Sequence, residues 1–101
     1  MVKAEITARL RSAVEDSAYR DRIKSVALFG SHVRGTAGAD SDIDVLIDFD
    51  PQAMIGLFEF IEIQEQLSEA LGRKVDLLTP QALSKYFRDE VLKEAEPVYG
   101  A

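Results

Sequence analysis

Apolar residues recur along the chain with two periods, and each period predicts one kind of element. Ile6, Leu10 and Val14 follow one another at four-residue steps. One face of an α-helix repeats about every 3.6 residues, so this spacing predicts an amphipathic helix over residues 3–18. A similar spacing predicts a longer helix over residues 54–71. Its apolar positions are Leu57, Phe58, Ile61, Leu67 and Leu71.

Alternation of apolar and polar side chains predicts a strand at residues 42–49, because successive side chains of a strand point to opposite faces. One face carries Ile43, Val45, Ile47 and Phe49. The other face carries Asp42, Asp44, Leu46 and Asp48. Shorter apolar runs predict strands at residues 25–29, directly before a glycine, and at residues 74–78, shortly before a proline.

The C-terminal residues 81–100 are expected to form one or two short helices. Their apolar face would run through Leu83, Phe87, Val91 and Leu92. Ser31 can cap a further short helix after the first strand. Helices and strands therefore alternate along the chain, which predicts a single α/β domain over residues 1–101 with a small sheet.

Composition limits the functions that this domain can serve. The chain has 101 residues, a net charge of −6 and no cysteine. The acidic balance argues against a general nucleic-acid binder, since such proteins need a basic face against phosphates. The lack of cysteine excludes disulfides, thiolate catalysis and zinc–thiolate sites. No run approaches the ~20 apolar residues of a membrane span, and the charged N-terminus has no apolar signal-peptide core, so we expect a cytoplasmic protein.

Aspartates on the 42–49 strand are the first candidates for chemistry. Asp42 and Asp44 are two residues apart, so their carboxylates project from one face, ~7 Å apart along the strand. Such a pair can converge on hard cations, and Mg²⁺ takes a few carboxylate oxygens together with waters and phosphates. Asp76 lies within the apolar 74–78 strand, where an acid is costly without a partner. If the two strands are neighbours, Asp76 completes a three-carboxylate cluster; otherwise its side chain simply ends in solvent.

The turn Gly30–Ser31, directly after the first predicted strand, is the second candidate. Backbone N–H groups at the start of a helix attract a phosphate, and a capping serine serves the same geometry. Gly30 is expected to let the backbone approach that phosphate closely and to need a positive φ. A metal site beside a phosphate cradle describes a nucleoside triphosphate site.

Three other ligand-binding motifs can be excluded, because the sequence lacks residues that each of them requires. Two glycines have the spacing of a Walker A loop, but Thr36 stands where that motif requires lysine. Residues 40–44 are similar to the start of a calcium EF-hand loop, but Val45 and Pro51 stand at its glycine and glutamate positions. No Rossmann glycine pattern follows a strand. The pattern that remains is Gly-Ser, ten residues and Asp-x-Asp, followed by a strand acid.

This pattern resembles the signature of the polymerase β-like nucleotidyltransferase superfamily. The run from Phe29 to Asp48 is similar to the minimal, MNT-type members of that superfamily. The resemblance implies a three-stranded mixed sheet flanked by helices. It also implies that Asp42 and Asp44 bind two Mg²⁺ ions, with Asp76 joining at the catalytic metal.

The same resemblance implies nucleotide-binding roles around the turn. Gly30 and Ser31 would hold the triphosphate of ATP. Arg34 occupies the usual arginine position of the family, and it can contact phosphate or pair with a nearby acid such as Asp40. His32 is a departure from the family pattern without an assigned role.

The MNT-type resemblance also implies an activity. Many such proteins are encoded beside a HEPN-domain ribonuclease toxin, and some transfer AMP from ATP to one of its tyrosines. We therefore expect a magnesium-dependent nucleotidyltransferase that acts as an antitoxin, with Asp76 or a water accepting the proton. Little chain is left for an acceptor pocket, so the acceptor is expected on a partner protein or in an oligomer. Two alternatives stay open: an antitoxin that acts by binding alone, and a small-molecule (antibiotic) nucleotidyltransferase.

Overall fold

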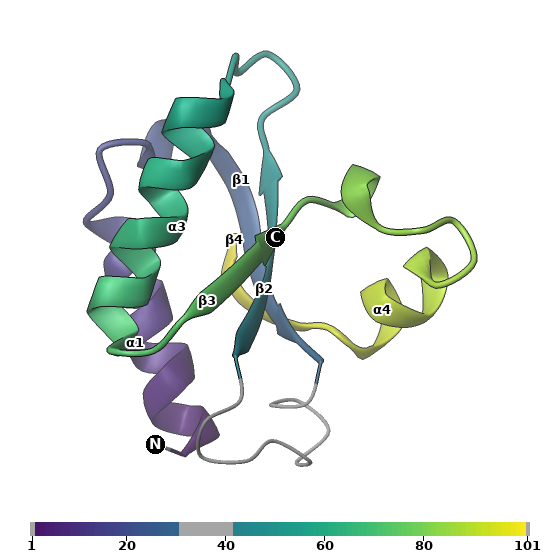
Figure 1. Cartoon of the computed structure of the whole chain (residues 1–101), viewed down its shortest axis with the longest axis horizontal. Coiled ribbons are helices and arrows are strands. Elements are labelled where there is room, and N and C mark those ends of the chain that lie inside the picture. The colour runs from purple at the N-terminus through teal and green to yellow at the C-terminus, as the bar shows by residue number, and fades with distance from the viewer. Residues whose placement is uncertain (1, 31–41, 101) are drawn as a thin grey trace.

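The computed structural model describes residues 2–30 and 42–100. These residues form one four-stranded sheet with α1 and α3 side by side on one face and α4 on the other side (Figure 1). The helices are α1 (Lys3–Glu15), α3 (Leu57–Leu71) and α4 (Arg88–Glu94), with 3-10 turns at Arg20–Arg22 and Pro80–Ala82. The strands are β1 (Ile23–Phe29), β2 (Ile43–Phe49), β3 (Val75–Leu78) and β4 (Glu96–Gly100). None of these helices is long and apolar enough to cross a membrane.

The sheet is mixed and has the strand order β3-β2-β1-β4. β1 runs antiparallel to both of its neighbours, whereas β2 and β3 are parallel. Parallel neighbours need a crossover connection, and α3 provides it between β2 and β3. The two acid-bearing strands are therefore neighbours, which is the condition that the sequence argument for Asp76 required.

The α/β class and the mixed sheet with flanking helices are confirmed, but the expected number of three strands is wrong. The last part of residues 81–100, expected to be helical, forms β4 against the edge of β1. The sequence pattern did not predict this strand because it contains Pro97 and Gly100, and both residue types are depleted in strands. Long-range contacts form it instead: Val98 is buried, and its carbonyl accepts a hydrogen bond from Nε of Arg11 at 2.9 Å.

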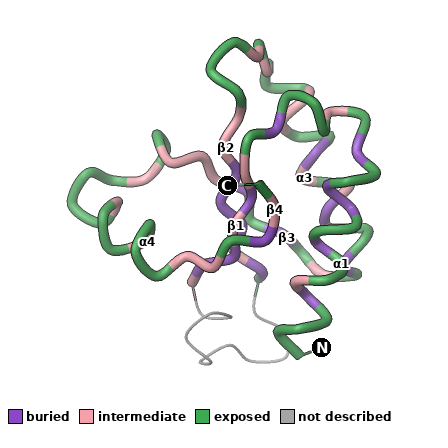
Figure 2. Tube along the Cα trace, turned by 180° about the vertical axis from the view of Figure 1, so that it is seen from behind, coloured by how far each residue is buried: buried purple, intermediate pink, exposed green. Residues whose placement is uncertain are grey.

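The core lies between the sheet and the helix pair α1–α3, where buried positions from both layers meet (Figure 2). Ile6, Leu10 and Val14 of α1 are all buried, as their four-residue spacing predicted. The apolar face of β2 is buried through Ile43, Val45 and Ile47. Burying a side chain of this size contributes about 1.5–3 kcal/mol. These residues of α1 and β2, which the sequence pattern placed on an apolar face, are therefore also the ones that contribute to the core.

The core face of α3 agrees with the prediction at Leu67 and Leu71 and differs from it at the other three positions. The helix buries Ile63, Leu67 and Leu71. Exposed instead are Leu57, Phe58 and Ile61, at 71%, 84% and 39%. Phe60 packs edge-to-face on Phe49 of β2, with the ring centroids 6.4 Å apart. Contact with the sheet therefore sets the rotation of α3 about its axis. The side of α3 that reaches the core carries residues three or four positions apart: Phe60, Ile63, Leu67 and Leu71.

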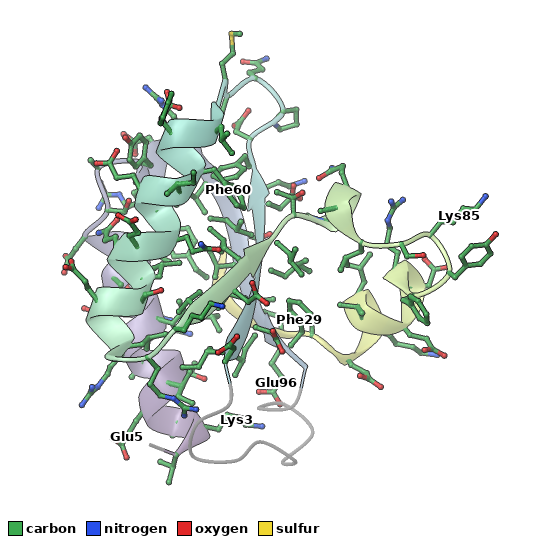
Figure 3. The ribbon with its side chains drawn as sticks, in the orientation of Figure 1. Lys3, Glu5, Phe29, Phe60, Lys85 and Glu96 are labelled. Atoms are coloured by element: carbon green, nitrogen blue, oxygen red, sulfur yellow. The ribbon has the colours of Figure 1, made fainter. Side chains whose placement is uncertain are left out.

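The segment around α4 is only partly covered. Phe87 and Leu92, expected to face a core, are 62% and 44% exposed. An ion pair at 2.7 Å between Lys3 and Glu96 connects α1 to the start of β4, where both side chains lie close together (Figure 3). β4 is thus held by the helix layer, while α4 stands apart from it.

Candidate functional site

Side chains on the sheet face that turns away from α1 and α3 lie in rows across the strands. The strand register places Phe29 of β1 opposite Asp44 of β2, and Asp44 opposite Asp76 of β3. We call Phe29, Asp44 and Asp76 the acidic row. Phe29 projects to the side of the sheet on which α4 lies (Figure 3). The register therefore brings together two of the three predicted acids from distant parts of the sequence.

Asp42, the third predicted acid, comes directly before β2 and two residues before Asp44. Its Oδ2 atom lies 3.6 Å from Nζ of Lys74, and the two side chains are 44% and 74% exposed. Solvent screening leaves such an exposed ion pair worth roughly 0–1 kcal/mol. The N–H of Ile43 also donates a hydrogen bond to the carbonyl of Lys74 at 3.0 Å. All three predicted acids consequently lie at the same end of the parallel pair β2–β3.

Gly30 follows the acidic row directly and has a φ of +78°. A Cβ added to Gly30 would collide with the carboxylate of Asp44 and would lie 3.0 Å from its Cγ. The expectation that Gly30 needs a positive φ is therefore confirmed. In the structure the group that approaches its backbone closely is the carboxylate of Asp44. The approach of a phosphate to the same backbone stays a prediction.

Other predicted nucleotide-binding residues, Ser31 and Arg34, lie outside the described residues, as does His32. The short helix expected after Ser31 falls in the same part of the chain. Their roles stay predictions, and the described part of the site consists of Gly30 and the three aspartates.

The oxygen donors of the site suit Mg²⁺. This ion is usually held by one or two carboxylates, and waters and substrate phosphates complete its octahedron. Asp44 and Asp76 supply a facing pair, and Asp42 adds a donor at the same end of the strands. Across residues 2–30 and 42–100, no group of three or more His, Cys, Asp or Glu side chains is arranged to hold a metal by itself. As placed in the structure, Asp42, Asp44 and Asp76 do not form such a group either, so Mg²⁺ would need water or phosphate oxygens as further ligands. Metal binding by the three carboxylates stays a prediction.

An apolar cavity of about 220 Å³, which the sequence did not predict, lies beside the acidic row. Leu46 lies in the polar phase of the β2 alternation but is only 6% exposed. An apolar residue at a polar position was the available signal that other residues cover it. Lys74 was also missed, although its place two residues before Asp76 puts it at the same end of β3.

Residues 8–98 match the nucleotidyltransferase domain family, a range that includes Gly30, all three aspartates and every strand except the last residues of β4. This chain belongs to that family. Among its relatives, this nucleotidyltransferase is 37% identical over 90 residues to the protein adenylyltransferase MntA of Thermococcus cleftensis. The match covers 89% of each chain. The resemblance to MntA-like minimal nucleotidyltransferases is therefore confirmed.

Solved structures give the same fold. A protein assigned as a minimal nucleotidyltransferase superposes on this nucleotidyltransferase with a TM-score of 0.77 at 34% identity, covering 96% of both chains. A toxin–antitoxin structure with AMP-PNP gives a TM-score of 0.76 at 22% identity, covering 94% of this chain and 73% of that one. The MntA–HepT toxin–antitoxin complex gives 0.70 at 18% identity, covering 98% and 74%. The polymerase β-like nucleotidyltransferase fold is thus confirmed.

Proposed function

We propose that this nucleotidyltransferase transfers AMP from ATP to a tyrosine hydroxyl of a HEPN-type partner, with Mg²⁺, and thereby acts as an antitoxin. Its relative MntA is a protein adenylyltransferase. The structural neighbours include a tri-AMPylated HEPN toxin of Shewanella oneidensis in complex with an MNT antitoxin. The observation in this chain that carries the proposal is the facing pair Asp44 and Asp76 beside the positive-φ Gly30.

Each residue of the site has a role in this reaction. Asp42 and Asp44, joined by Asp76 at the catalytic metal, would hold Mg²⁺, which neutralises the triphosphate and polarises the attacking hydroxyl when it is bound. Asp76 accepts the proton of that hydroxyl as its oxygen attacks the α-phosphorus. Gly30, together with Ser31 and Arg34, holds the phosphates that leave as pyrophosphate. In this proposal the partner supplies the acceptor hydroxyl when the two proteins form a complex.

Neutralisation by contact alone is the second candidate function, and one observation favours it. The loop before α3 and the first turns of α3 expose four apolar side chains. They are Met54, Leu57, Phe58 and Ile61. Exposed apolar residues close together are typical of protein–protein contact sites. In this function the partner would be blocked without AMP transfer.

Co-expression with a HEPN-type toxin, the partner proposed here, separates the two functions. Mass spectrometry of the partner should show added AMP with the native chain and none with the double variant Asp42→Ala/Asp44→Ala. The matched control is Asp21→Ala/Asp89→Ala, which removes the same charge at two exposed positions away from the site. This control should transfer AMP as well as the native chain does.

Growth of cells that express the toxin gives the decisive readout. Loss of protection by Asp42→Ala/Asp44→Ala, while the two proteins still co-purify, supports neutralisation by AMP transfer. Full protection by the same double variant means that contact alone neutralises the partner, and the enzymatic role is then wrong.

A further inference from the structure

The apolar cavity lies on the same sheet face as the acidic row. Its floor is the adjacent row of the sheet, in which Ala27 of β1 pairs with Leu46 of β2 and with Pro97 of β4. Leu92 of α4 and Ala95, which caps the end of that helix, complete the lining. The cavity therefore lies between the sheet and the segment that carries α4, which stands on this side of the sheet (Figure 1).

The lining suits an uncharged, apolar group. Ser25 and Asp48, which face each other in the strand register, are its polar residues apart from the hydroxyl of Tyr99. Among the described residues, none that lines the cavity is a lysine or an arginine. A phosphate placed there would meet no cation and would be repelled by the carboxylate of Asp48. The triphosphate of ATP therefore does not belong in this cavity.

The floor of the cavity is one step away from the acidic row. Leu46 lies two residues from Asp44 on the same face of β2, a separation of ~7 Å along a strand. That separation is close to the length of a tyrosine side chain. A tyrosine side chain that starts over Leu46 and points along β2 toward Asp44 can therefore place its hydroxyl beside Asp44 and Asp76.

The in-line geometry expected for the reaction also places the acceptor over the floor of the cavity. Gly30 follows Phe29, so it lies beyond the acidic row on the side away from Ala27. In the proposed function the departing phosphates are held there. Attacking and leaving oxygens are roughly in line in phosphoryl transfer. The acceptor must then approach from the opposite side, over the floor of the cavity.

We propose that this cavity is the acceptor subsite, which takes the ring of the partner's tyrosine and directs its hydroxyl to the acidic row. This inference rests on the proposed function and adds where the acceptor binds. The phenol oxygen bonds to the α-phosphorus, the bond from that phosphorus to the bridging oxygen of pyrophosphate breaks, and the phenol proton passes to Asp76. The adenine base is another flat group of suitable size, and the experiments separate it from the acceptor.

The first experiment measures binding, with N-acetyltyrosinamide as the probe and without ATP or metal. Methyl NMR signals of Ala27, Leu46 and Leu92 should shift on titration with the probe, and N-acetylphenylalaninamide should compete for the same site. Asp21→Asn, at an exposed position that does not line the cavity, should leave this binding intact. Unshifted cavity methyls overturn the proposal, as does a larger shift of the same methyls with ATP and Mg²⁺, which would assign the cavity to adenine.

The second experiment fills the cavity. Ala95→Leu should raise the KM for N-acetyltyrosinamide as acceptor by about tenfold, since small changes in an apolar pocket have effects of that order. The affinity for ATP with Mg²⁺ should stay unchanged. Ala70→Leu makes the same substitution at an exposed position of α3 and is the matched control. Leu92→Ala, at a partly exposed position, removes part of the wall instead and should also weaken probe binding.

The two proposals fail in different ways. If AMP reaches the partner's tyrosine while Ala95→Leu and Ala70→Leu give the same KM, the acceptor subsite lies elsewhere and the proposed function stands. If no acceptor receives AMP although the probe binds beside Leu46, the proposed function is wrong while the aromatic binding site remains.

Discussion

The backbone of Gly30 lies against the carboxylate of Asp44, so closely that a Cβ on Gly30 would stand 3.0 Å from Cγ of Asp44. Gly30 also has a φ of +78°, which side chains disfavour. The end of β1 thus meets a carboxylate of β2 at a glycine, where the missing side chain leaves space for that carboxylate. Changes at Gly30 should consequently affect both the local backbone and the position of Asp44.

Gly30→Ala should reduce stability by about 1–2 kcal/mol through the positive φ, and it should also displace the Asp44 carboxylate and impair ATP binding with Mg²⁺. Gly72→Ala is the matched control, because Gly72 has a φ of +66° and no atom within 4 Å of an added Cβ. Thermal unfolding should show similar losses for both variants, with calorimetry showing impaired ATP binding only for Gly30→Ala. Equal ATP binding by the two variants would contradict the placement of Gly30 in the site.

Asp44→Asn should abolish the dependence of ATP affinity on Mg²⁺, because the amide removes a carboxylate ligand and half of the facing pair with Asp76. Calorimetric titrations with Mg²⁺ and with EDTA measure this difference. Asp21→Asn, at a 96% exposed side chain in the 3-10 turn before β1, should keep the native difference. If the Asp44→Asn variant still binds ATP more tightly with Mg²⁺, the metal site is assigned to the wrong residues.

Lys74→Met should raise the affinity for Mg²⁺ in the absence of ATP, because the lysine ammonium lies 3.6 Å from the carboxylate of Asp42 and competes with the metal. Stability should change by less than about 1 kcal/mol, since the ion pair is exposed. Lys93→Met, on α4, serves as the control for charge. A lower Mg²⁺ affinity for Lys74→Met would show that Asp42 does not act as a metal ligand.

Leu67→Ala should destabilise the fold by about 2–5 kcal/mol, because Leu67 is fully buried in the stripe of α3 that faces the sheet. Leu57→Ala is the same substitution at a 71% exposed position and should change stability by about 0.5 kcal/mol or less. Denaturant unfolding of both variants compares them directly. Similar losses would mean that α3 is rotated differently from the structure.

Glu62→Gln should lower the pKa of Tyr19, whose hydroxyl donates a hydrogen bond to Oε2 of Glu62 at 2.6 Å. That hydrogen bond raises the pKa of Tyr19 above its ordinary value of 10.0. The folded state therefore holds the proton more tightly than the unfolded chain. The resulting stability is fully present below pH 10.0 and is lost as the pH rises through the raised pKa.

An NMR titration of the tyrosine ring carbons measures this pKa. Glu65→Gln, at an exposed position on the same helix, should leave the titration of Tyr19 unchanged. An unchanged pKa of Tyr19 in Glu62→Gln would contradict the hydrogen bond between Tyr19 and Glu62 of α3.

Local periodicity was sufficient to predict the elements whose own sequence has a helical spacing or an alternation of apolar and polar residues. The four-residue spacing of Ile6, Leu10 and Val14 marks the buried face of α1, and the alternation of β2 separates its buried positions from Asp44. Gly30 was also identified, because a strand that ends in glycine indicates a backbone of unusual φ. These features depend on neighbours in the sequence, and short-range geometry determines them.

Tertiary structure decided the rest, because it depends on which distant segments pair and in what register. β4 forms on the edge of β1 although its own sequence has no strand pattern, and the sheet rotates α3 so that Phe58 faces solvent while Ile63 does not. Two aspartates on separate strands become a facing pair only through the parallel register of β2 and β3. The cavity over Leu46 likewise exists only because the α4 segment folds back onto the acid-bearing face, a contact that no local pattern specifies.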